Sequence, residues 1–320
     1  MNSKILISIV IPAYNEQEVL PAFHARLTTA LAELSYTIEI VYINDGSTDD
    51  TLAVLEELYT NDTRVALVDL SRNFGKEIAL TAGLHNAHGD AVIVIDADLQ
   101  DPPEVIPQLI QEWVNGFDVV YARRSQRKGE TWLKKASAAS FYRIIQRLSK
   151  VRIPEDTGDF RLLSRRAVEA LNTLPEQHRF MKGLFAWIGY KQKAVYYDRD
   201  PRFAGTSKWN YWKLWNFAID GITSFTTAPL KFATYIGFVT ACIAFLYGGY
   251  MLVRTLLFGN PVPGYPSLVV IILFLGGIQL MAIGVVGEYV GRIFTETKRR
   301  PLYFVNEYKP RRDSDNGAQQ

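Results

Sequence analysis

The sequence predicts an α/β fold with a Rossmann-like, mostly parallel sheet, followed by two membrane-spanning helices. Two observations lead to this prediction. Short β-branched runs alternate with amphipathic stretches over residues 5–121, as expected for parallel strands covered by helices on both faces. Two charge-free apolar segments, residues 232–253 and 265–287, are each long enough to cross ~30 Å of hydrocarbon as a helix.

Composition limits the classes of function. The chain has 320 residues, of which 48% are hydrophobic, enough for one sizeable α/β domain and an additional apolar part. Its formal net charge is only +2, so no nucleic-acid partner is expected. The single cysteine, Cys242, cannot form a disulfide within the chain and lies in the first apolar segment.

The two apolar segments predict a membrane hairpin. Lys231 precedes the first segment, Arg292 and the basic run 298–300 follow the second, and the connection contains only Arg254. Because basic residues flank the cytoplasmic ends of membrane helices, the soluble parts and both termini are expected in the cytoplasm, at the inner (plasma) membrane. A pair of buried helices in a soluble protein is the alternative.

The sequence therefore divides into three predicted parts. Residues 1–229 form a cytoplasmic α/β domain, 230–295 two transmembrane helices, and 296–320 a cytoplasmic tail. The α/β domain includes two predicted membrane-interface helices, near 130–150 and 209–228. The first mixes basic with apolar and aromatic residues, and the second is rich in tryptophan, which favours the interface. An ordinary core helix is the alternative for both segments, and it is weaker for the second because of its position just before the first span.

The most distinctive polar cluster is I-D-A-D-L-Q-D-P-P-E, which begins where the apolar run 91–95 ends. Asp96 and Asp98 are two residues apart, so on an extended chain their carboxylates point the same way and can share one hard cation. Gln100 can add a carbonyl oxygen. Mg²⁺ or Mn²⁺ fits best, because such ions combine one or two carboxylates with substrate phosphates. An acidic turn that caps the next helix is the alternative.

Two further polar clusters follow predicted strands: P-A-Y-N-E at residues 12–16 and I-N-D-G-S-T-D-D at 43–50. Glu16 and Asp45 can accept hydrogen bonds from a base or ribose, and Tyr14 offers a flat surface for stacking. Ligands of such sheets lie beyond the carboxyl ends of the strands, so these clusters are expected beside the acidic cluster. Helix capping is the alternative for each cluster.

The order of the motifs resembles a known family. P-A-Y-N-E, N-D-G-S, L-S-R-N-F-G-K-E, D-A-D-L-Q-D-P-P-E, T-G-D-F-R-L-L-S and R-F-A-G-T-S-K-W follow one another along the chain. This order resembles the polyprenyl-phosphate glycosyltransferases, including dolichol-phosphate mannose synthase and the bactoprenol glucosyltransferases, in the inverting GT-A glycosyltransferase family 2. The resemblance covers residues 7–209, and the two apolar segments match the bactoprenol branch. Asn44 departs from it, because relatives often have an acidic residue there.

The resemblance implies a role for each motif. Lys76 would approach the donor phosphates, although a solvated lysine at a helix start is the alternative. Asp96 would support the ribose or the metal. The implied nucleotide-sugar-binding residues are Pro12, Tyr14, Glu16, Asp45, Lys76 and Asp96, and the implied metal ligands are Asp96, Asp98 and Gln100.

The implied acceptor, polyprenyl (undecaprenyl) phosphate, is already anionic near pH 7 and needs no strong general base. It needs a basic pocket that aligns its phosphate for in-line attack, for which Arg124, Lys135 and Arg202 are the candidates. Snorkelling or ordinary surface charge is the alternative for each. Asp159 is implied nearest the reacting centre, and the implied catalytic residues are Asp159, Asp98 and Arg202.

The implied reaction is inverting transfer of one sugar from a nucleotide sugar to the lipid phosphate, for cell-envelope or lipopolysaccharide glycosylation. Glucose from UDP-glucose is the first expectation, with galactose, mannose and an amino-arabinose derivative left open.

A processive polysaccharide synthase would need a channel, which two spans do not form unaided. A non-catalytic membrane scaffold is disfavoured, because Asp96 and Asp98 are present together with Arg202 and Asp159. Small residues in the spans allow close helix packing in a homo-oligomer.

Overall fold

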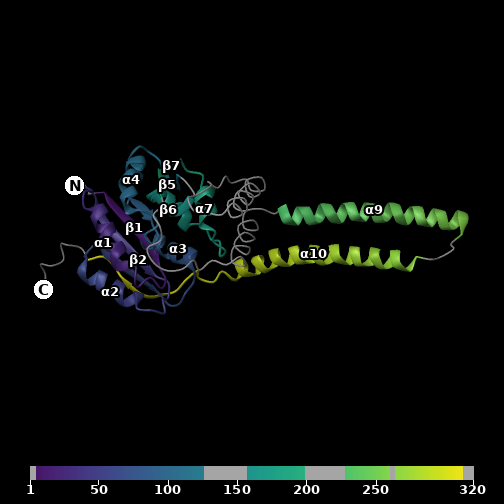
Figure 1. Ribbon diagram of the computed structural model, residues 1–320, viewed down its shortest axis with the longest axis horizontal. Helices are drawn as coiled ribbons and strands as arrows, with labels where there is room; N and C mark the ends of the chain where they lie inside the picture. Colours follow the sequence, from purple (N-terminus) through teal and green to yellow (C-terminus); the bar gives the residue numbers. More distant parts are fainter. Residues whose placement is uncertain (1–4, 126–156, 199–227, 260–263, 313–320) are drawn as a thin grey trace.

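A mixed sheet forms the centre of the α/β domain. The computed structural model describes residues 5–125, 157–198, 228–259 and 264–312. Within these residues the strand order is β7-β5-β6-β4-β1-β2-β3-β8 (Figure 1). The strands are β1 (Leu6–Ala13), β2 (Thr37–Asn44), β3 (Val65–Leu70), β4 (Ala91–Val94), β5 (Val119–Arg124), β6 (Thr157–Ser164), β7 (Gln192–Tyr197) and β8 (Val305–Lys309).

Most of the sheet is parallel, as the sequence predicts. Strand β1 pairs in parallel with β2 and β4, β2 with β3, and β5 with β7. Strand β6 lies antiparallel between β4 and β5, and β8 pairs antiparallel with β3. The parallel central strands are buried on both faces, which explains their continuous apolar sequence.

Helices cover both faces of the sheet. Successive strand residues point to opposite faces, so Ile9 of β1 packs with helices α1, α2 and α4, whereas Val10 packs with α3, α6 and α7. The result is a three-layer α/β domain. The helices are α1 (Leu20–Leu31), α2 (Thr51–Asn61), α3 (Lys76–Asn86), α4 (Ile106–Val114), α6 (Arg165–Asn172) and α7 (Met181–Trp187).

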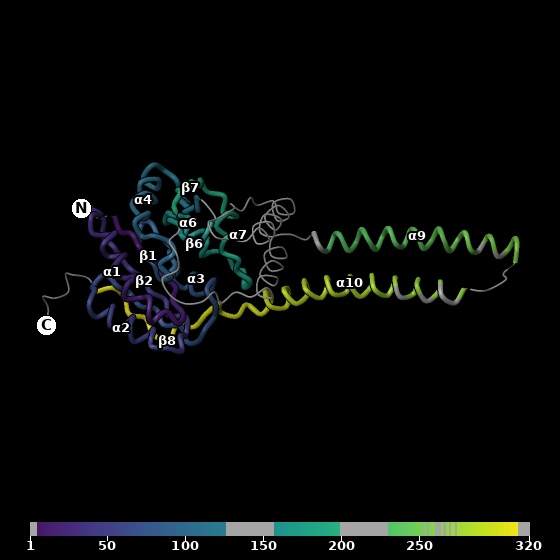
Figure 2. Tube along the Cα trace, in the orientation of Figure 1, coloured from purple at the N-terminus to yellow at the C-terminus, as the bar shows by residue number. Residues whose placement is uncertain are grey.

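Two long helices extend away from this domain as an antiparallel pair (Figure 1), α9 (Ala228–Phe258) and α10 (Tyr265–Lys298). Both are long and apolar enough to cross a membrane, with mean hydropathies of 1.9 and 2.4, and their most apolar windows are 0% buried. Helices buried in a soluble protein would not expose these faces, so the pair is suited to lipid. Helix α9 begins and α10 ends at the end of the pair that faces the α/β domain (Figure 2).

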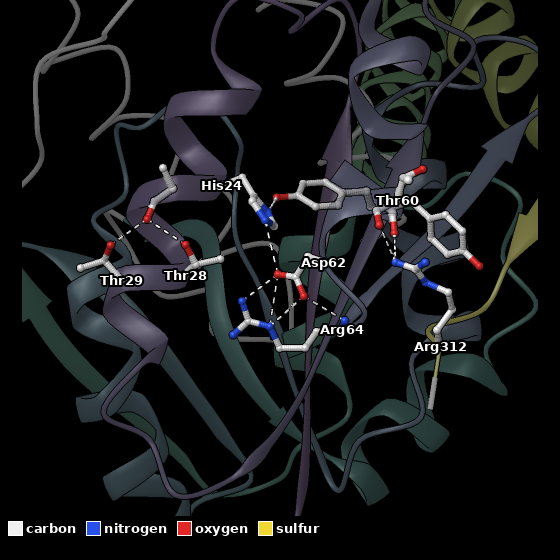
Figure 3. Close-up of polar contacts among 10 residues, drawn as sticks. His24, Thr28, Thr29, Thr60, Asp62, Arg64 and Arg312 are labelled. Atoms are coloured by element: carbon white, nitrogen blue, oxygen red, sulfur yellow. Dashed lines mark hydrogen bonds and ion pairs between the residues drawn. The ribbon is translucent and has the colours of Figure 1, made fainter. Parts of the chain in front are cut away.

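The chain after α10 returns along the α/β domain. We call residues 299–312 the C-terminal strap (Figure 2). Within the predicted tail of residues 296–320, its strand β8 completes one edge of the sheet beside β3. Lys309 Nζ lies 2.7 Å from Glu56 Oε1, and the Arg312 guanidinium donates to the carbonyl of Thr60 at 2.8 Å (Figure 3). The strap therefore fastens the chain that leaves α10 to the α/β domain.

A polar cluster joins α1 to the end of α2 (Figure 3). The Arg64 guanidinium donates to Asp62, with 2.7 Å between Nη2 and Oδ2. His24 contacts the Tyr42 hydroxyl through Nδ1 at 3.0 Å, and its Nε2 lies 3.4 Å from Asp62. Burial lowers the pKa of His24 despite this carboxylate. Since its members pair with one another, the cluster fastens α1, β2 and α2 together.

Several sequence-based predictions lie outside the described residues. These are the interface helix near 130–150, nearly all of the one near 209–228, and the acceptor candidates Lys135 and Arg202. They stay predictions.

Candidate active site

The loops that follow β1, β2 and β3 are joined at the carboxyl edge of the sheet. The Asp45 N–H donates to the Ala13 carbonyl at 2.9 Å, and the Asp45 carboxylate accepts the N–H groups of Phe74 and Gly75 at 2.8 and 3.0 Å. A Cβ on Gly46, whose φ is +60°, would lie only 2.3 Å from the Arg72 carbonyl carbon. This close approach requires glycine and packs the three loops into one surface.

The first of these loops contains Tyr14 and Glu16. Asn15 has a φ of 54°, a conformation that asparagine tolerates better than most residues, and its N–H donates to Ser47 Oγ at 3.1 Å. The Glu16 N–H donates to Thr51 Oγ1 at 2.8 Å. The clusters at 12–16 and 43–50 therefore meet, as the parallel sheet predicts.

Asp45 supports these loops from behind. Its side chain is buried, with the residue only 2% exposed, and both of its oxygens accept main-chain N–H groups. Burial raises its pKa, although the two N–H groups oppose that change. From the sequence, Asp45 is predicted to contact the nucleoside. The structure shows in addition that its carboxylate holds the loop at residues 72–75, which its position after a strand did not indicate.

Lys76 lies between two aspartates at the neighbouring part of the same edge. In the antiparallel β4–β6 pair Val94 is opposite Arg161, so two residues further on Asp96 faces Asp159. Lys76 Nζ lies 2.7 Å from Asp96 Oδ2 and 2.6 Å from Asp159 Oδ2. The other oxygen of each aspartate is buried and has no hydrogen-bond partner among the described residues. The cluster thus offers two unused acceptors beside a fixed cation.

The charges of this cluster stabilise one another. The Lys76 side chain is half exposed, and partial desolvation of its ammonium would lower its pKa, but Asp159 and Asp96 outweigh this effect and raise that pKa well above its ordinary value. Burial would raise the pKa of Asp159, but Lys76 and Lys182 outweigh it and hold that pKa below its ordinary range. Burial raises the pKa of Asp96. Asp159 and Lys76 are therefore both ionised at neutral pH.

Asp98 and Gln100 occupy a strained turn just beyond Asp96. The intervening Leu99 has a φ of 59°, which is unusual for a bulky residue, and the Gln100 N–H donates to Asp98 Oδ1 at 3.1 Å. Such strain persists only where the surroundings impose it, and it is common at functional sites. The turn holds both side chains at the end of β4, where the sequence predicts them.

The residues present fit a divalent cation that is shared with a substrate. No group of three or more His, Cys, Asp or Glu side chains could enclose a metal within the part of the chain that the structure describes. Asp96 nevertheless has a buried oxygen without a hydrogen-bond partner in the described residues, and Asp98 follows at the same strand end. Mg²⁺ characteristically takes one or two carboxylates and completes its shell with phosphate oxygens and water.

Arg124 is the one predicted acceptor-phosphate residue that lies in the described part of the chain. It ends β5, and a Cβ on Gly158, next to Asp159, would lie 3.9 Å from its Nη2. Its Nε is buried and has no partner among the described residues. The Tyr197 hydroxyl donates to Asp101 in the same region. Within the described residues, Arg124 therefore has a donor without a partner close to Asp159.

Two further charged residues belong to the site: Arg161, which is buried, and Glu77, which is half-buried and was not identified from the sequence. Arg161 of β6 donates to the carbonyl of Gly158 at 2.9 Å and lies 3.9 Å from the centre of the Phe185 ring, and burial lowers its pKa to about 10. Glu77 accepts the Met181 N–H at 3.3 Å, which joins α3 to α7. A Lys-Glu pair at a helix start is too common a pattern to have indicated Glu77.

Glu77 is the titratable group of this site that is poised near neutrality. Its burial and the nearby Asp159 raise its pKa from 4.5 to about 7, against the opposing effect of Lys76. Between these values the folded chain binds a proton that the unfolded chain has lost. Its contribution therefore makes stability fall as the pH rises from 4.5 to 7.

Glu77→Gln is expected to reduce the loss of stability between pH 4.5 and 7, because an amide does not titrate. Melting temperatures measured at several pH values between 5 and 8 would check it, with Glu57→Gln on the exposed side of α2 as the matched control. Equal pH slopes for Glu77→Gln and the wild-type chain would contradict the assignment.

Known protein families match the α/β domain and the helical pair of this chain separately. Residues 8–171 match glycosyl transferase family 2, and residues 228–293 match the GtrB C-terminal hairpin. An uncharacterized glycosyltransferase of Synechocystis is 54% identical over 301 residues, which cover 94% of this chain and 95% of that protein. The bactoprenol glucosyl transferase of Shigella phage SfV is 52% identical over 303 residues, which cover 95% and 99%.

A prophage bactoprenol glucosyl transferase homolog of Escherichia coli K12 is 51% identical, over 95% of this chain and 99% of that protein. The family match spans half of the chain, and these relatives span nearly all of it. The predicted resemblance and the predicted GT-A fold class are thereby confirmed. The chain belongs to glycosyl transferase family 2 and carries the GtrB type of C-terminal hairpin.

Proposed function

We propose that this glycosyltransferase moves one sugar, with inversion, from a nucleotide sugar to polyprenyl (undecaprenyl) phosphate at the cytoplasmic face of the inner membrane. The observation that carries the proposal is the Asp96–Lys76–Asp159 cluster at the carboxyl edge of the sheet. Bactoprenol glucosyl transferases that are 52% identical over nearly the whole chain support this acceptor. Glucose from UDP-glucose is the first donor to test.

The donor would lie across the loops after β1, β2 and β3. Tyr14 offers a ring for stacking, and Pro12 and Glu16 flank it. The hydrogen bonds of Asn15 and Asp45 hold these loops before any ligand arrives, which reduces the entropy lost on binding. The diphosphate would then extend toward Lys76.

A divalent cation, Mg²⁺ or Mn²⁺, would be held by Asp96, Asp98 and Gln100. When bound, it would supply positive charge that stabilises the departing nucleoside diphosphate. Lys76 adds a fixed charge at the same strand end, since its ammonium is 2.7 Å from Asp96. The leaving group therefore meets positive charge where its own negative charge develops.

The acceptor phosphate needs orientation rather than deprotonation, because it is largely ionised near pH 7. The Arg124 Nε, which has no partner among the described residues, is suited to one of its oxygens, with Lys135 and Arg202 as further candidates. Asp159 is ionised beside Lys76 and would orient the sugar or the acceptor for in-line attack. A single displacement at the anomeric carbon inverts its configuration.

The helical pair would anchor the site to the membrane. Basic residues follow α10 at 298–300, whereas the connection between the helices has only Arg254. By the positive-inside rule the α/β domain and the C-terminal strap face the cytoplasm. This agrees with their position at the same end of the pair (Figure 1).

The test uses the full chain purified in detergent, with MgCl₂, undecaprenyl phosphate and a panel of nucleotide sugars. We expect lipid-linked sugar from one donor, no product without the lipid, and loss of product in Asp98→Asn. Polymer formation would instead indicate a processive synthase. No transfer from any donor, with either Mg²⁺ or Mn²⁺, would contradict the proposal and favour a scaffold.

A further inference from the structure

A buried carboxylate connects the C-terminal strap to the end of β2. Asn306 Nδ2 donates to Asp69 Oδ2 at 2.8 Å, and Asn44 Nδ2 donates to Asp69 Oδ1 at 2.7 Å. Asp69 is only 5% exposed and Asn44 2%. Asp69 of β3 thus links Asn44, at the end of β2, to Asn306, which lies in the strap after α10.

A β-bulge aims Asn306 at this carboxylate. Strand β8 pairs residue for residue with β3 until Asp69 faces Glu307, and then the register shifts so that Leu70 faces Val305. Asn306 is the extra residue. Bulges redirect side chains and are frequent beside functional sites. The irregularity therefore accounts for the contact between Asn306 and Asp69.

The hydrogen bonds continue from Asn44 to the donor-side loops. Asn44 Oδ1 accepts the Ser47 N–H at 3.2 Å, and Ser47 Oγ accepts the Asn15 N–H at 3.1 Å. Asn15 has the positive φ of the first loop, between Tyr14 and Glu16. The Asn44 side chain is oriented by Asp69, since its amide donates there while its carbonyl oxygen accepts from Ser47.

We propose that Asn306 is a positioning residue for nucleotide binding, acting through Asp69 and Asn44 on the loop that carries Tyr14 and Glu16. The inference rests on the proposed donor position. Hydrogen bonds to a buried carboxylate are stronger than neutral ones, and disrupting one leaves a costly unpaired group. The strap that follows the membrane hairpin thus completes the support of the donor site.

The other strap contacts provide matched controls. Lys309 pairs with Glu56 of α2 at 2.7 Å, and Arg312 donates to the carbonyl of Thr60 at the end of the same helix. Both fasten the strap without touching Asp69 or Asn44. A general loosening of the strap would affect nucleotide binding equally in variants of Lys309 and Asn306, whereas the proposed role is specific to Asn306.

The test compares Asn306→Asp, Lys309→Ala and the exchange Asp69→Asn/Asn306→Asp. Asn306→Asp sets two carboxylates against each other. The exchange restores both hydrogen bonds, because Asn at 69 can accept from Asn44 and donate to Asp at 306. We expect Asn306→Asp to weaken UDP binding and raise the KM for the sugar donor about tenfold, with kcat within about twofold. The exchange should recover most of this loss, and Lys309→Ala should resemble the wild-type chain.

UDP binding to the full chain in detergent is measured by calorimetry, and Asn306→Ala replaces Asn306→Asp if the latter does not fold. Equal binding in Asn306→Asp, Asn306→Ala and the wild-type chain would overturn this inference alone, as would an exchange variant that recovers nothing. A wild-type chain that binds neither UDP nor any other nucleoside diphosphate would overturn both this inference and the proposed function.

Discussion

Asp159→Asn is expected to reduce kcat for sugar transfer by at least about 100-fold, the effect of removing an electrostatic group at a reacting centre. The amide keeps the shape of the side chain but loses the negative charge that lies 2.6 Å from the Lys76 ammonium. The KM for the nucleotide sugar should change much less, because Asp159 lies on β6 and the proposed nucleoside loops follow β1, β2 and β3. Steady-state rates at saturating donor and lipid, with the lipid-linked sugar quantified, give both parameters.

Asp62→Asn is the matched control for Asp159→Asn. Asp62 also forms a close ion pair, at 2.7 Å from Arg64, but it belongs to the cluster that fastens α1 to α2 (Figure 3). We expect it to lower the melting temperature while leaving kcat nearly unchanged. A kcat for Asp159→Asn within about fivefold of the wild-type value would remove Asp159 from the reacting centre.

Strands and clusters with a strong local pattern could be predicted from the sequence. The runs that form β1 to β5 are β-branched and apolar because both faces of the parallel sheet are covered, so periodicity and length identify them. The position of Asp96 at the end of β4 followed from the same pattern. The apolar helices α9 and α10 were evident from length and the absence of charge.

Other elements could not be predicted, because their stability comes from distant partners. Strand β6 contains the buried charges Asp159 and Arg161, so it does not resemble a core strand, and β8 is short and mostly exposed. Asn306 and Asp69 are far apart in the sequence, and no local pattern indicates that they meet. Pairing of this kind is a property of the tertiary fold.

The same limit applies to the site. A polar residue at a strand end can be expected at the functional edge, but its partner is set by the strands that lie beside it. Asp96 lies opposite Asp159 because of the antiparallel register of β4 and β6. Lys76 can contact both carboxylates only because they face each other. The supporting role of Asp45 depends likewise on the close approach of the loop at 72–75.

Lys76→Met is expected to reduce kcat/KM for the donor by about 100-fold or more at pH 7, since it removes the positive charge at the proposed phosphate position and unpairs two carboxylates. In the wild-type chain Lys76 offsets the effect of burial on Asp159 and holds its pKa below the ordinary range. Without the ammonium, burial and mutual repulsion of Asp96 and Asp159 both favour protonation. At least one of these carboxylates would then titrate at a higher pH.

The pH profile distinguishes this role of Lys76 from a loss of fold. Activity that requires ionised Asp159 is lost as the pH falls through its pKa, so raising that pKa moves the acid limb of kcat/KM to higher pH. Lys76→Met should therefore lose its residual activity at a higher pH than the wild-type chain, and Lys76→Arg, which keeps the charge, should shift less. Lys309→Met removes another lysine paired at 2.7 Å and should leave the profile unchanged. An acid limb of Lys76→Met that coincides with the wild-type limb would show that Lys76 does not set the ionisation of Asp159, and its contribution would then be confined to binding the donor phosphates.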